Sequence, residues 1–493
     1  MRNLTLLTDF YELTMMQAYH HAEMATGRRQ LAVFDMFYRE NPCGNGYAVA
    51  AGLAQVIDYI EGLTFEAADI DYLRSTGVFK EPFLEYLRNF KFTGNIHAVP
   101  EGTVVFPGEP LVRVTAPLLE GQLVETAILN IINHQSLIAT KAARVCWAAQ
   151  GDRVLEFGLR RAQGPDAGLY GARAAMIGGC SGTSNVLAGQ LFDVPVRGTH
   201  AHSWIMSFDT ELEAFRYYAK LYPTACILLV DTYDTLKSGV PNAIKVFQEM
   251  KDSGVTLSSY GIRLDSGDLA YLSKQARKML DAAGFTDAFI SASNDLDEYL
   301  IAELKTQGAK ISLWGVGTHL ITSKEYPAFG GVYKLSALSN TMSAGDMDPT
   351  ASQWQYKIKL SEDPVKVTNP GIKKIIRLYD AATNKMKADL IALDHETIDP
   401  TKDLTIFDPI ATWKKMTLKA GEYTTRELLQ PVFENGKNVY PALTVTEICA
   451  YAANERNTLW DEHKRLVRPQ TMPVDLSQAL YDLKQDMIAK LRT

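Results

Sequence analysis

Two histidines that could do chemistry stand two residues apart in the segment Gly198-Thr199-His200-Ala201-His202-Ser203. In a strand, both side chains would point to one face, as in His-x-His metal sites of barrel hydrolases. In a loop, one imidazole could act as a nucleophile beside the other. Ordinary core or surface histidines would give the same pattern, so all three interpretations stay open. Other histidines, such as His319, lack a metal-ligand spacing, which counts against a metallohydrolase.

A second candidate is the segment Arg263-Leu264-Asp265-Ser266-Gly267-Asp268. Two carboxylates beside an arginine and a glycine turn suit ribose hydroxyls or Mg²⁺, with the cation facing a phosphate. A plain structural role is also expected for one aspartate, as the N-cap of a following helix. The segment therefore indicates a sugar-phosphate site without requiring one.

Two glycine-rich turns could hold phosphate. Glycines let backbone N–H groups approach phosphate oxygens, and a helix N-terminus adds a favourable dipole. The turns are Gly315-Val316-Gly317-Thr318 and Gly178-Gly179-Cys180-Ser181-Gly182-Thr183. A tight turn alone uses the same residues, so phosphate binding and simple chain reversal both stay open.

These segments follow short apolar runs that alternate with helical stretches from Arg153 to about Leu338. The expected strands are 154–157, 225–230, 259–264, 288–291 and 310–314. Repeated β-α units imply parallel strands, whose carboxyl ends gather functional residues. The number of units favours a barrel, and an open doubly wound sheet is the alternative.

Other elements surround this region. A strand is expected at 31–38 and a long helix from Leu123 to about Ala149. Beyond Ser339 the chain becomes polar and rich in turn residues, and a final helix runs from about Leu476 to Leu491. The predicted fold is α/β, an irregular (β/α) barrel over 146–340 with an α+β N-terminal domain over 1–145. A C-terminal region over 341–493 is expected to pack on both.

The composition limits the classes of binding partner and the cellular compartment that are expected for this protein. The 50 Lys+Arg and 57 Asp+Glu give a net charge of −7, which argues against nucleic-acid and membrane-surface binders. The five cysteines form no CxxC pair, as expected for reduced thiols, and the first residues are too polar for a signal peptide. A soluble, cytoplasmic protein is expected.

Six blocks in register resemble the nicotinate phosphoribosyltransferase family, the type II phosphoribosyltransferases of NAD synthesis. They fall in all three thirds of the chain and in the family's order, so together they are far more specific than any one motif. The blocks are Leu7–Met15, Phe37–Pro42, Glu156–Asp166, Gly198–Ser203, Arg263–Asp268 and Lys366–Gly371.

The resemblance implies a reaction. Nicotinate and 5-phosphoribosyl 1-pyrophosphate give nicotinate mononucleotide and pyrophosphate, coupled to hydrolysis of ATP with Mg²⁺, as the first step of NAD synthesis from nicotinate. It also implies that His202, and not His200, is transiently phosphorylated by ATP. A homodimer with shared active sites is implied as well. No residues are predicted to bind a metal ion permanently.

The resemblance further implies roles for single residues. Phe157 would sandwich the pyridine ring with Tyr11 of a partner subunit. Ser184, in the turn Gly182-Thr183-Ser184, favours nicotinate over nicotinamide, because a hydroxyl can donate to a carboxylate. The residues implied to face the anionic groups, ribose and phosphates of substrates and product are Arg160, Arg263, Asp265, Ser293, Asn294, Gly317, Thr318, Arg39, Lys366 and Lys373. The last three would reach pyrophosphate or ATP across a dimer interface, or be plain surface charges.

Three alternatives remain beside this interpretation. A sister phosphoribosyltransferase would use nicotinamide or quinolinate. A metal-dependent barrel hydrolase would be built on His200 and His202. The third alternative is a binding module without catalytic activity.

Overall fold

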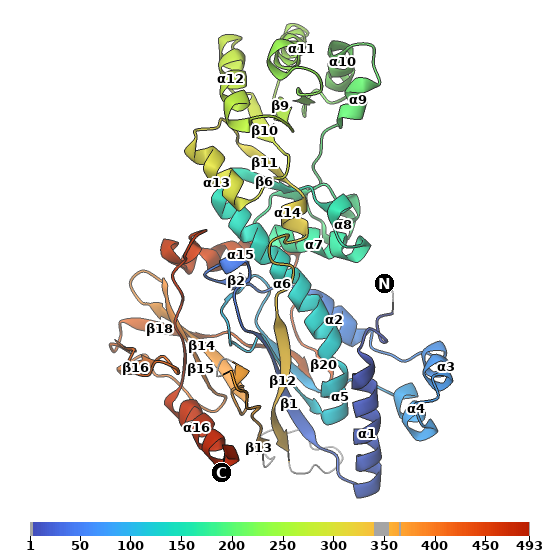
Figure 1. The fold of residues 1–493 in the computed structure, drawn as a ribbon, viewed down its shortest axis with the longest axis vertical. Coiled ribbons are helices and arrows are strands. Elements are labelled where there is room, and N and C mark those ends of the chain that lie inside the picture. Colours follow the sequence, from blue (N-terminus) through green and yellow to red (C-terminus); the bar gives the residue numbers. More distant parts are fainter. Residues whose placement is uncertain (1–2, 340–353, 364–365, 493) are drawn as a thin grey trace. The chain divides into compact units, whose positions relative to one another are not determined.

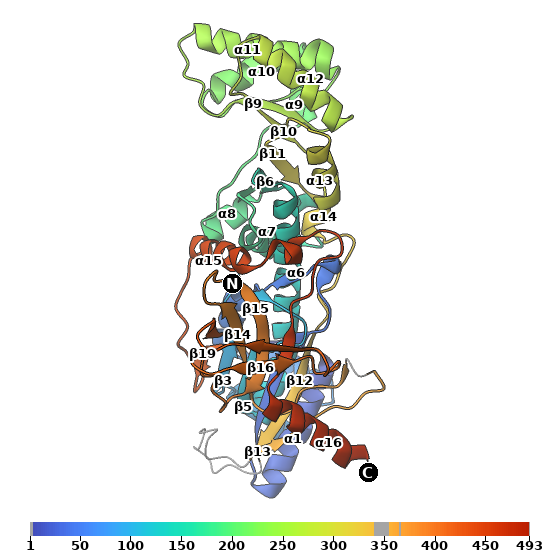
Figure 2. The same cartoon turned by 90° about the vertical axis from the view of Figure 1, so that its left-hand side faces the viewer.

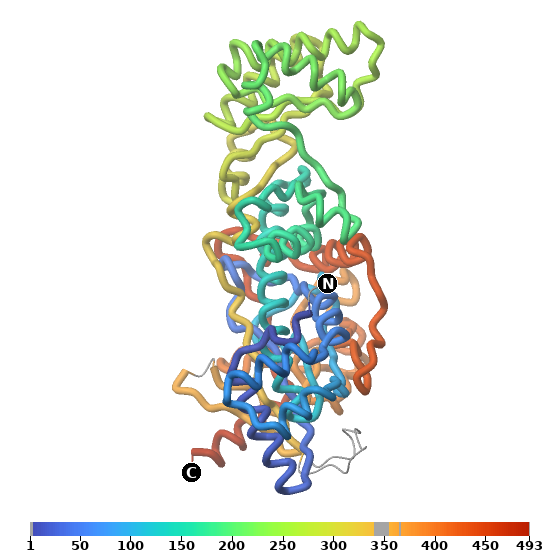
Figure 3. The backbone as a smooth tube through the Cα atoms, turned by 90° about the vertical axis from the view of Figure 1, so that its right-hand side faces the viewer, coloured from blue at the N-terminus to red at the C-terminus, as the bar shows by residue number. Residues whose placement is uncertain are grey.

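The protein is described from a computed structural model that covers residues 3–339, 354–363 and 366–492. The chain divides into two compact units. Unit 1 comprises residues 1–137, 328–443 and 450–493, and unit 2 comprises residues 138–327 and 444–449. Figure 1 labels their elements, and Figure 3 traces most of unit 2 as one continuous stretch of backbone from cyan to yellow.

A six-stranded sheet organises unit 2, and all of its strands are parallel. Their spatial order is β7-β6-β11-β10-β9-β8. The bounds are β6 (Arg153–Glu156), β7 (Gly182–Thr183), β8 (Ile227–Leu229), β9 (Gly261–Leu264), β10 (Phe289–Ala292) and β11 (Leu313–Val316). The parallel sheet expected between 154 and 314 is confirmed, although β11 begins three residues later than predicted.

Helices follow the strands of this sheet. Figures 1 and 2 both place α11 and α12 beside β9, and α12 contacts β9 and β10. The helices are α7 (Pro165–Gly178), α8 (Val186–Phe192), α9 (His202–Met206), α10 (Glu211–Leu221), α11 (Val240–Asp252), α12 (Leu269–Ala282), α13 (Glu298–Thr306) and α14 (Thr318–Ile321). Asp268 accepts a hydrogen bond from the Tyr271 N–H at 2.9 Å, so one aspartate of the 263–268 segment is the expected N-cap.

Hydrogen bonds between the described strands leave β7 and β8 as the two edges of the sheet. The expected α/β class is therefore observed, while closure into a barrel is not formed by strand pairing among the described residues. The parallel arrangement still aligns the carboxyl ends of six strands along one edge, which is what the site requires.

Unit 1 contains a seven-stranded sheet in the order β13-β12-β1-β5-β3-β19-β20, antiparallel throughout. The predicted strand 31–38 is β1 (Leu31–Tyr38), in the interior of this sheet. The other strands are β3 (Asn95–Ala98), β5 (Val112–Pro117), β12 (Gly331–Ser339), β13 (Trp354–Tyr356), β19 (Gln430–Glu434) and β20 (Lys437–Asn438). A separate pair joins β2 (Ala48–Val49) to β4 (Val104–Val105).

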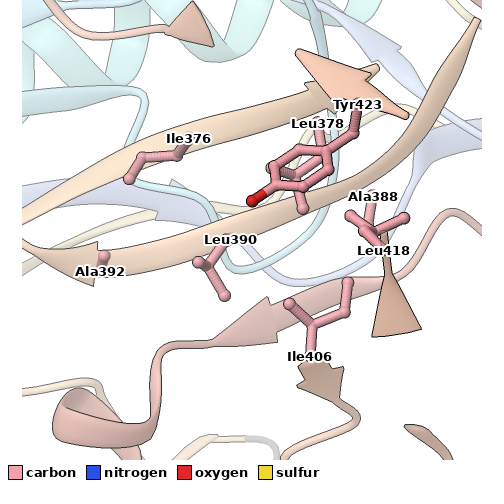
Figure 4. Packing of buried hydrophobic residues seen from close by; sticks show 8 residues of the cluster. All are labelled: Ile376, Leu378, Ala388, Leu390, Ala392, Ile406, Leu418 and Tyr423. Atoms are coloured by element: carbon pink, nitrogen blue, oxygen red, sulfur yellow. The ribbon is translucent and has the colours of Figure 1, made fainter. Parts of the chain in front are cut away.

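A four-stranded sheet, β18-β14-β15-β21, forms the second layer of strands in unit 1. Its members are β14 (Lys373–Asp380), β15 (Met386–Leu393), β18 (Tyr423–Glu427) and β21 (Val474–Leu476), and a hairpin joins β16 (Leu404–Phe407) to β17 (Lys415–Leu418). Aliphatic side chains from these strands surround Tyr423 in a buried cluster (Figure 4).

The polar composition beyond Ser339 did not predict these strands. Two of their buried residues are charged, and their charges are neutralised only when the strands pair. Arg377 on β14 lies directly opposite Asp389 on β15. The guanidinium donates to both carboxylate oxygens, with Nη2 2.6 Å from Oδ2, and also to Glu455 at 3.1 Å. A buried charge is tolerated when it is paired and hydrogen-bonded in this way.

The helices of unit 1 are α1 (Phe10–Thr26), α2 (Leu53–Glu61), α3 (Ala67–Ser75), α4 (Glu81–Arg88), α5 (Leu118–Leu123) and α16 (Gln478–Arg492). The predicted long helix is α6 (Glu125–Ala148), and α15 (Val445–Thr458), like α6, carries residues of both units. In the described part of the chain, no helix combines the length and apolar character needed to span a bilayer. The three-domain division stays a prediction, and its 340/341 boundary lies outside the described residues.

Candidate active site

The carboxyl ends of the parallel strands carry the polar side chains of the candidate site in unit 2. Phe157 follows β6, Ser184 follows β7, and Asp265 follows β9. Ser293 and Asn294 follow β10, while Gly317 and Thr318 follow β11. Because the strands are parallel, these residues meet at one edge of the sheet, as predicted.

Arg263, the third residue of β9, is the centre of a hydrogen-bond network. Its Nε donates to Ser293 Oγ at 3.0 Å and its Nη1 to Thr199 Oγ1 at 3.0 Å. Nη1 also donates to the His200 carbonyl at 3.2 Å, and Nη2 lies 3.1 Å from Asp265 Oδ1. Four of the five guanidinium N–H groups thus hold the site together, which leaves one N–H of Nη2 for an anionic ligand.

Asp265 completes this network. Its Oδ1 accepts hydrogen bonds from Ser293 Oγ and Arg263, whereas its Oδ2 accepts none from the described residues. The side chain is about a quarter exposed, at 28%. A carboxylate that is held on one oxygen and open on the other can accept from ribose hydroxyls or bind Mg²⁺.

Asp231, two residues beyond β8, lies between His202 and the Asp265 loop. Its Oδ2 accepts from the Asp265 N–H and the Ser266 hydroxyl, each at 2.7 Å. Its Oδ1 lies 3.3 Å from Nε2 of His202, the first residue of α9. The position of Asp231 at a strand end was a signal in the sequence, but its contact with His202 was not foreseeable from spacing.

His200 has a different environment from His202. Burial lowers the pKa of His200 to about 4, and the nearby charges of Arg263 and His202 act in the same direction. Its Nε2 lies 3.4 Å from the Leu229 N–H, and its ring meets Tyr218 edge to face. His200 is therefore a partly buried residue whose neutral form is favoured, while the His202 side chain is 38% exposed.

Among the described residues, His200 and His202 belong to no close group of three possible metal ligands. Among the described residues, a single group of three possible ligands lies close together, and it consists of Asp297, His319 and Glu325. Two side chains of that group already have polar partners within the protein. His319 Nδ1 is 2.6 Å from Glu325 Oε1, and the other Glu325 oxygen is 2.8 Å from Lys141 Nζ.

Phe157 lies against Gly315 of the neighbouring strand β11. A Cβ atom at Gly315 would come within 2.6 Å of the Phe157 ring, so only glycine fits there. With Arg263 and Ser293, these two residues line a cavity of about 500 Å³. The lining therefore combines an aromatic ring with polar groups, as a flat, charged heterocycle requires.

Glu156 ties the Phe157 turn to the Ser184 turn. Its carboxylate accepts from the Gly158 N–H and, at 2.6 Å, from the Thr183 hydroxyl. Its carbonyl accepts from the Ser184 N–H at 2.9 Å. The side chain is fully buried, and burial raises its pKa, although both hydrogen bonds act in the opposite direction. Glu156 was not predicted as a site residue, because its effect depends on the β6–β7 pairing.

The loops after β10 and β11 leave backbone groups open. Asn294 and Asp295 both have positive φ angles, 100° and 43°, an uncommon conformation that often marks binding loops. The atom nearest to a Cβ at Gly317 would be the Phe157 carbonyl oxygen, at 3.5 Å. Packing therefore does not require glycine at 317. Arg160 is exposed in the turn after Phe157.

Four predicted site residues belong to unit 1. Tyr11 on α1 is 47% exposed, with its hydroxyl 3.5 Å from Glu125 Oε1. Arg39 follows β1, and its Nε has no partner among the described residues. Lys366 is exposed and lies 3.5 Å from Asp363. Lys373 is buried, with its Nζ 2.7 Å from Asp35 and 2.6 Å from the Gly371 carbonyl.

Three family models match the chain in order. They describe the nicotinate phosphoribosyltransferase N-terminal domain over residues 6–133, the family's central region over 153–348, and the C-terminal domain over 372–484. The chain is also 45% identical to nicotinate phosphoribosyltransferase of Bacillus subtilis over 491 residues, covering 100% of this chain and 96% of the relative. The chain belongs to the nicotinate phosphoribosyltransferase family.

Other members of this family are similar to this chain in sequence and structure along nearly its full length. The human nicotinate phosphoribosyltransferase is 33% identical over 542 residues, covering 98% of this chain and 96% of the human protein. The crystal structure of human nicotinic acid phosphoribosyltransferase superposes with a TM-score of 0.82 at 30% identity, covering 97% of this chain and 99% of that one. The mixed α/β fold is thus the fold of the nicotinate phosphoribosyltransferase family.

Proposed function

We propose that this chain transfers the phosphoribosyl group of 5-phosphoribosyl 1-pyrophosphate to nicotinate, forming nicotinate mononucleotide and pyrophosphate. Hydrolysis of ATP to ADP and phosphate accompanies the transfer, which is the first step of NAD synthesis from nicotinate. The observation that carries the proposal is the set of polar groups around Arg263, at the strand ends of a chain related to nicotinate phosphoribosyltransferases over its whole length.

Nicotinate is proposed to stack on Phe157, with Tyr11 of a partner subunit on its other face. Its carboxylate would accept a hydrogen bond from the Ser184 hydroxyl, while exposed Arg160 supplies a positive charge nearby. The pyridine nitrogen carries a free lone pair, so no general base is needed. The Glu156 contacts fix both Phe157 and Ser184, which supports a defined position for the ring.

The sugar phosphate is proposed to lie along the other strand ends. Asp265 Oδ2 accepts from the ribose hydroxyls, and the open Nη2–H of Arg263 faces an anionic oxygen. Gly317 and Thr318 hold the 5′-phosphate, with Ser293 and Asn294 alongside. Displacement at the anomeric carbon passes through an oxocarbenium-like state, which requires stabilisation of the departing pyrophosphate and exclusion of water. Arg39, Lys366 and Lys373 are proposed to face pyrophosphate or ATP.

His202 is proposed to accept the γ-phosphoryl group of ATP. With Nε2 facing Asp231, the Nδ1 lone pair can attack the γ-phosphorus while the bond to the bridging oxygen breaks and ADP leaves. The Asp231 carboxylate stabilises the positive charge that develops on the ring. Mg²⁺ would neutralise charge on the phosphates, and Asp265 Oδ2 is an oxygen ligand of the kind it prefers. Water later releases the phosphoryl group as phosphate.

We further propose a cytoplasmic homodimer with shared active sites, in which the parallel sheet of each unit 2 curls as an irregular barrel. Large apolar side chains of α8 are exposed in the single chain, at 72% for Val186 and 57% for Leu191. An exposed apolar helix face suits a subunit interface. The net charge of −7 is consistent with small-molecule substrates rather than nucleic acid or membrane.

One assay tests the proposed function. Pyrophosphate release is measured with nicotinate or nicotinamide, with and without ATP, for the parent and His202→Asn. We expect release with nicotinate, faster with ATP, and loss of the ATP effect and of acid-labile label from γ-labelled ATP in His202→Asn. Equal labelling of His202→Asn would overturn the phosphohistidine role, and preference for nicotinamide would identify the sister activity.

A further inference from the structure

A second cavity lies within unit 1, between its two larger sheets and the last helix. It encloses about 200 Å³. Strands β1 and β12 contribute residues from one sheet, β14, β15 and β21 from the other, and α16 closes one side. A cavity of about 150 Å³ is enough to bind benzene, so this one has room for a single aromatic ring with a small substituent.

The charges around this cavity do not balance. Its lining contains three lysines, Lys334, Lys373 and Lys484, and one carboxylate, Asp35. Asp35 and Lys373 neutralise each other, because their charged atoms lie 2.7 Å apart and both side chains are 4% exposed. Two ammonium groups therefore remain without a carboxylate among the described lining residues.

Lys484 is the more informative of these two. Its Nζ donates to Asn369 Oδ1 at 2.8 Å and lies 3.4 Å from the Val367 carbonyl, but no described carboxylate is within ion-pair distance. Burial, together with repulsion by Lys373, lowers the pKa of Lys484 to about 8. Lys374, by contrast, has an acidic partner in Glu427 at 2.8 Å. An ammonium group held in this way is stabilised by a bound anion.

The remaining walls are apolar. Phe37 and Leu335 come from the first sheet, Ile391 and Leu476 from the second, and Tyr481 from α16. A fully hydrated inorganic anion would leave these walls uncovered, whereas a small ring or short aliphatic body would cover them.

We propose that this cavity is a binding site for a small organic anion with an apolar body, whose charged group lies against Lys484. Carboxylates and phosphate monoesters share this chemistry. None of the lining residues belongs to unit 2, and Lys373 is the one lining residue that is also among those proposed above to face pyrophosphate or ATP.

Isothermal titration of the full-length chain tests the site directly. The probes are benzoate, phenyl phosphate and uncharged benzyl alcohol, each added in the presence of saturating nicotinate mononucleotide so that the proposed active site is occupied. We expect one equivalent of benzoate or phenyl phosphate to bind, with the tighter of the two identifying the charged group, and benzyl alcohol to bind at least tenfold more weakly.

Variants connect this binding to the cavity. Lys484→Met should weaken anion binding at least tenfold and Lys484→Arg by less than about threefold, while Lys415→Met, an exposed control on β17, should change nothing. Leu476→Phe fills the cavity from the opposite wall and should abolish binding, which provides a second test if Lys484→Met does not fold.

Three results would overturn the proposal: no binding of either anion to the parent, equal affinity of folded Lys484→Met and the parent, or equal binding of benzyl alcohol. Pyrophosphate release by the parent is measured separately. Anion binding without that activity would overturn the proposed function alone.

Discussion

Charged side chains occupy two very different environments in this molecule. In unit 1, Arg377, Asp389 and Glu455 are almost completely buried, and the guanidinium is surrounded by carboxylate oxygens at 2.6–3.2 Å. In unit 2, Arg263 and Asp265 lie at strand ends, are 17% and 28% exposed, and each keeps one hydrogen-bonding position open. The first group leaves no hydrogen-bonding position for a ligand. In the second group, the protein fills only some of the hydrogen-bonding positions.

This difference separates charges that stabilise a fold from charges that can bind a substrate. A buried pair must be complete, because an unpaired buried charge costs several kcal/mol. A binding site must be rigid but incomplete, so that the substrate supplies the last partners. Variants in each of the two groups test this contrast.

Arg377→Met should lower the free energy of unfolding by about 3–5 kcal/mol, because it leaves Asp389 buried without its ion-pair partner, although Glu455 keeps its pair with Arg426. Denaturant unfolding measures the loss, and kcat/KM per folded molecule should be unchanged. Arg216→Met, which breaks an exposed pair with Glu249, should cost about 1 kcal/mol or less. Equal costs for the two variants would contradict the assignment of Arg377 to the fold.

Asp265→Asn should lower kcat/KM for 5-phosphoribosyl 1-pyrophosphate roughly 100-fold, about 2.7 kcal/mol, with little change in stability. Steady-state pyrophosphate release measures it. Asp268→Asn is the matched control, because asparagine caps α12 as well as aspartate does. Loss of activity in the control but not in Asp265→Asn would assign the motif to structure alone.

Asp231→Asn should reduce the stimulation by ATP roughly 10-fold to 100-fold, because the amide no longer stabilises a charged His202 ring. The ratio of rates with and without ATP measures the effect, while the rate without ATP should change less. Asp234→Asn, in the exposed turn that follows, should leave the ratio intact. An unchanged ratio in Asp231→Asn would separate Asp231 from the phosphoryl step.

The last prediction concerns pH. The folded pKa of His200 is about 4, below the usual value of 6.5, so between these values the unfolded chain binds the extra proton. His200 therefore makes stability fall as pH decreases from 6.5 to 4, by up to about 1.4 kcal/mol per pH unit. Unfolding curves of His200→Gln should show a weaker pH dependence over this interval. An identical dependence would place His200 in water rather than in a partly buried environment.

Sequence patterns predicted the strands that carry the candidate site, but they did not predict strands β14 and β15 of unit 1. Short apolar runs ending in Asp265, Ser293 and Gly317 were sufficient to indicate parallel strands, and parallel strands bring their ends together. Strands β14 and β15 were not expected, because Arg377 and Asp389 make each segment appear polar until the pairing is known. Asp231 and Glu156 were likewise not assigned roles, since each acts through contacts to residues more than twenty positions away.

The most direct test of the central claim is a calorimetric titration of nicotinate mononucleotide into the parent, Arg263→Met and Arg277→Met. Both arginines are 17% exposed and pair with an aspartate, but Arg277 holds its own helix and the following loop. We predict that Arg263→Met binds the product at least 100-fold more weakly, with a melting temperature close to that of Arg277→Met, which binds normally. Parental affinity in folded Arg263→Met would contradict the assignment of the strand ends as the substrate site.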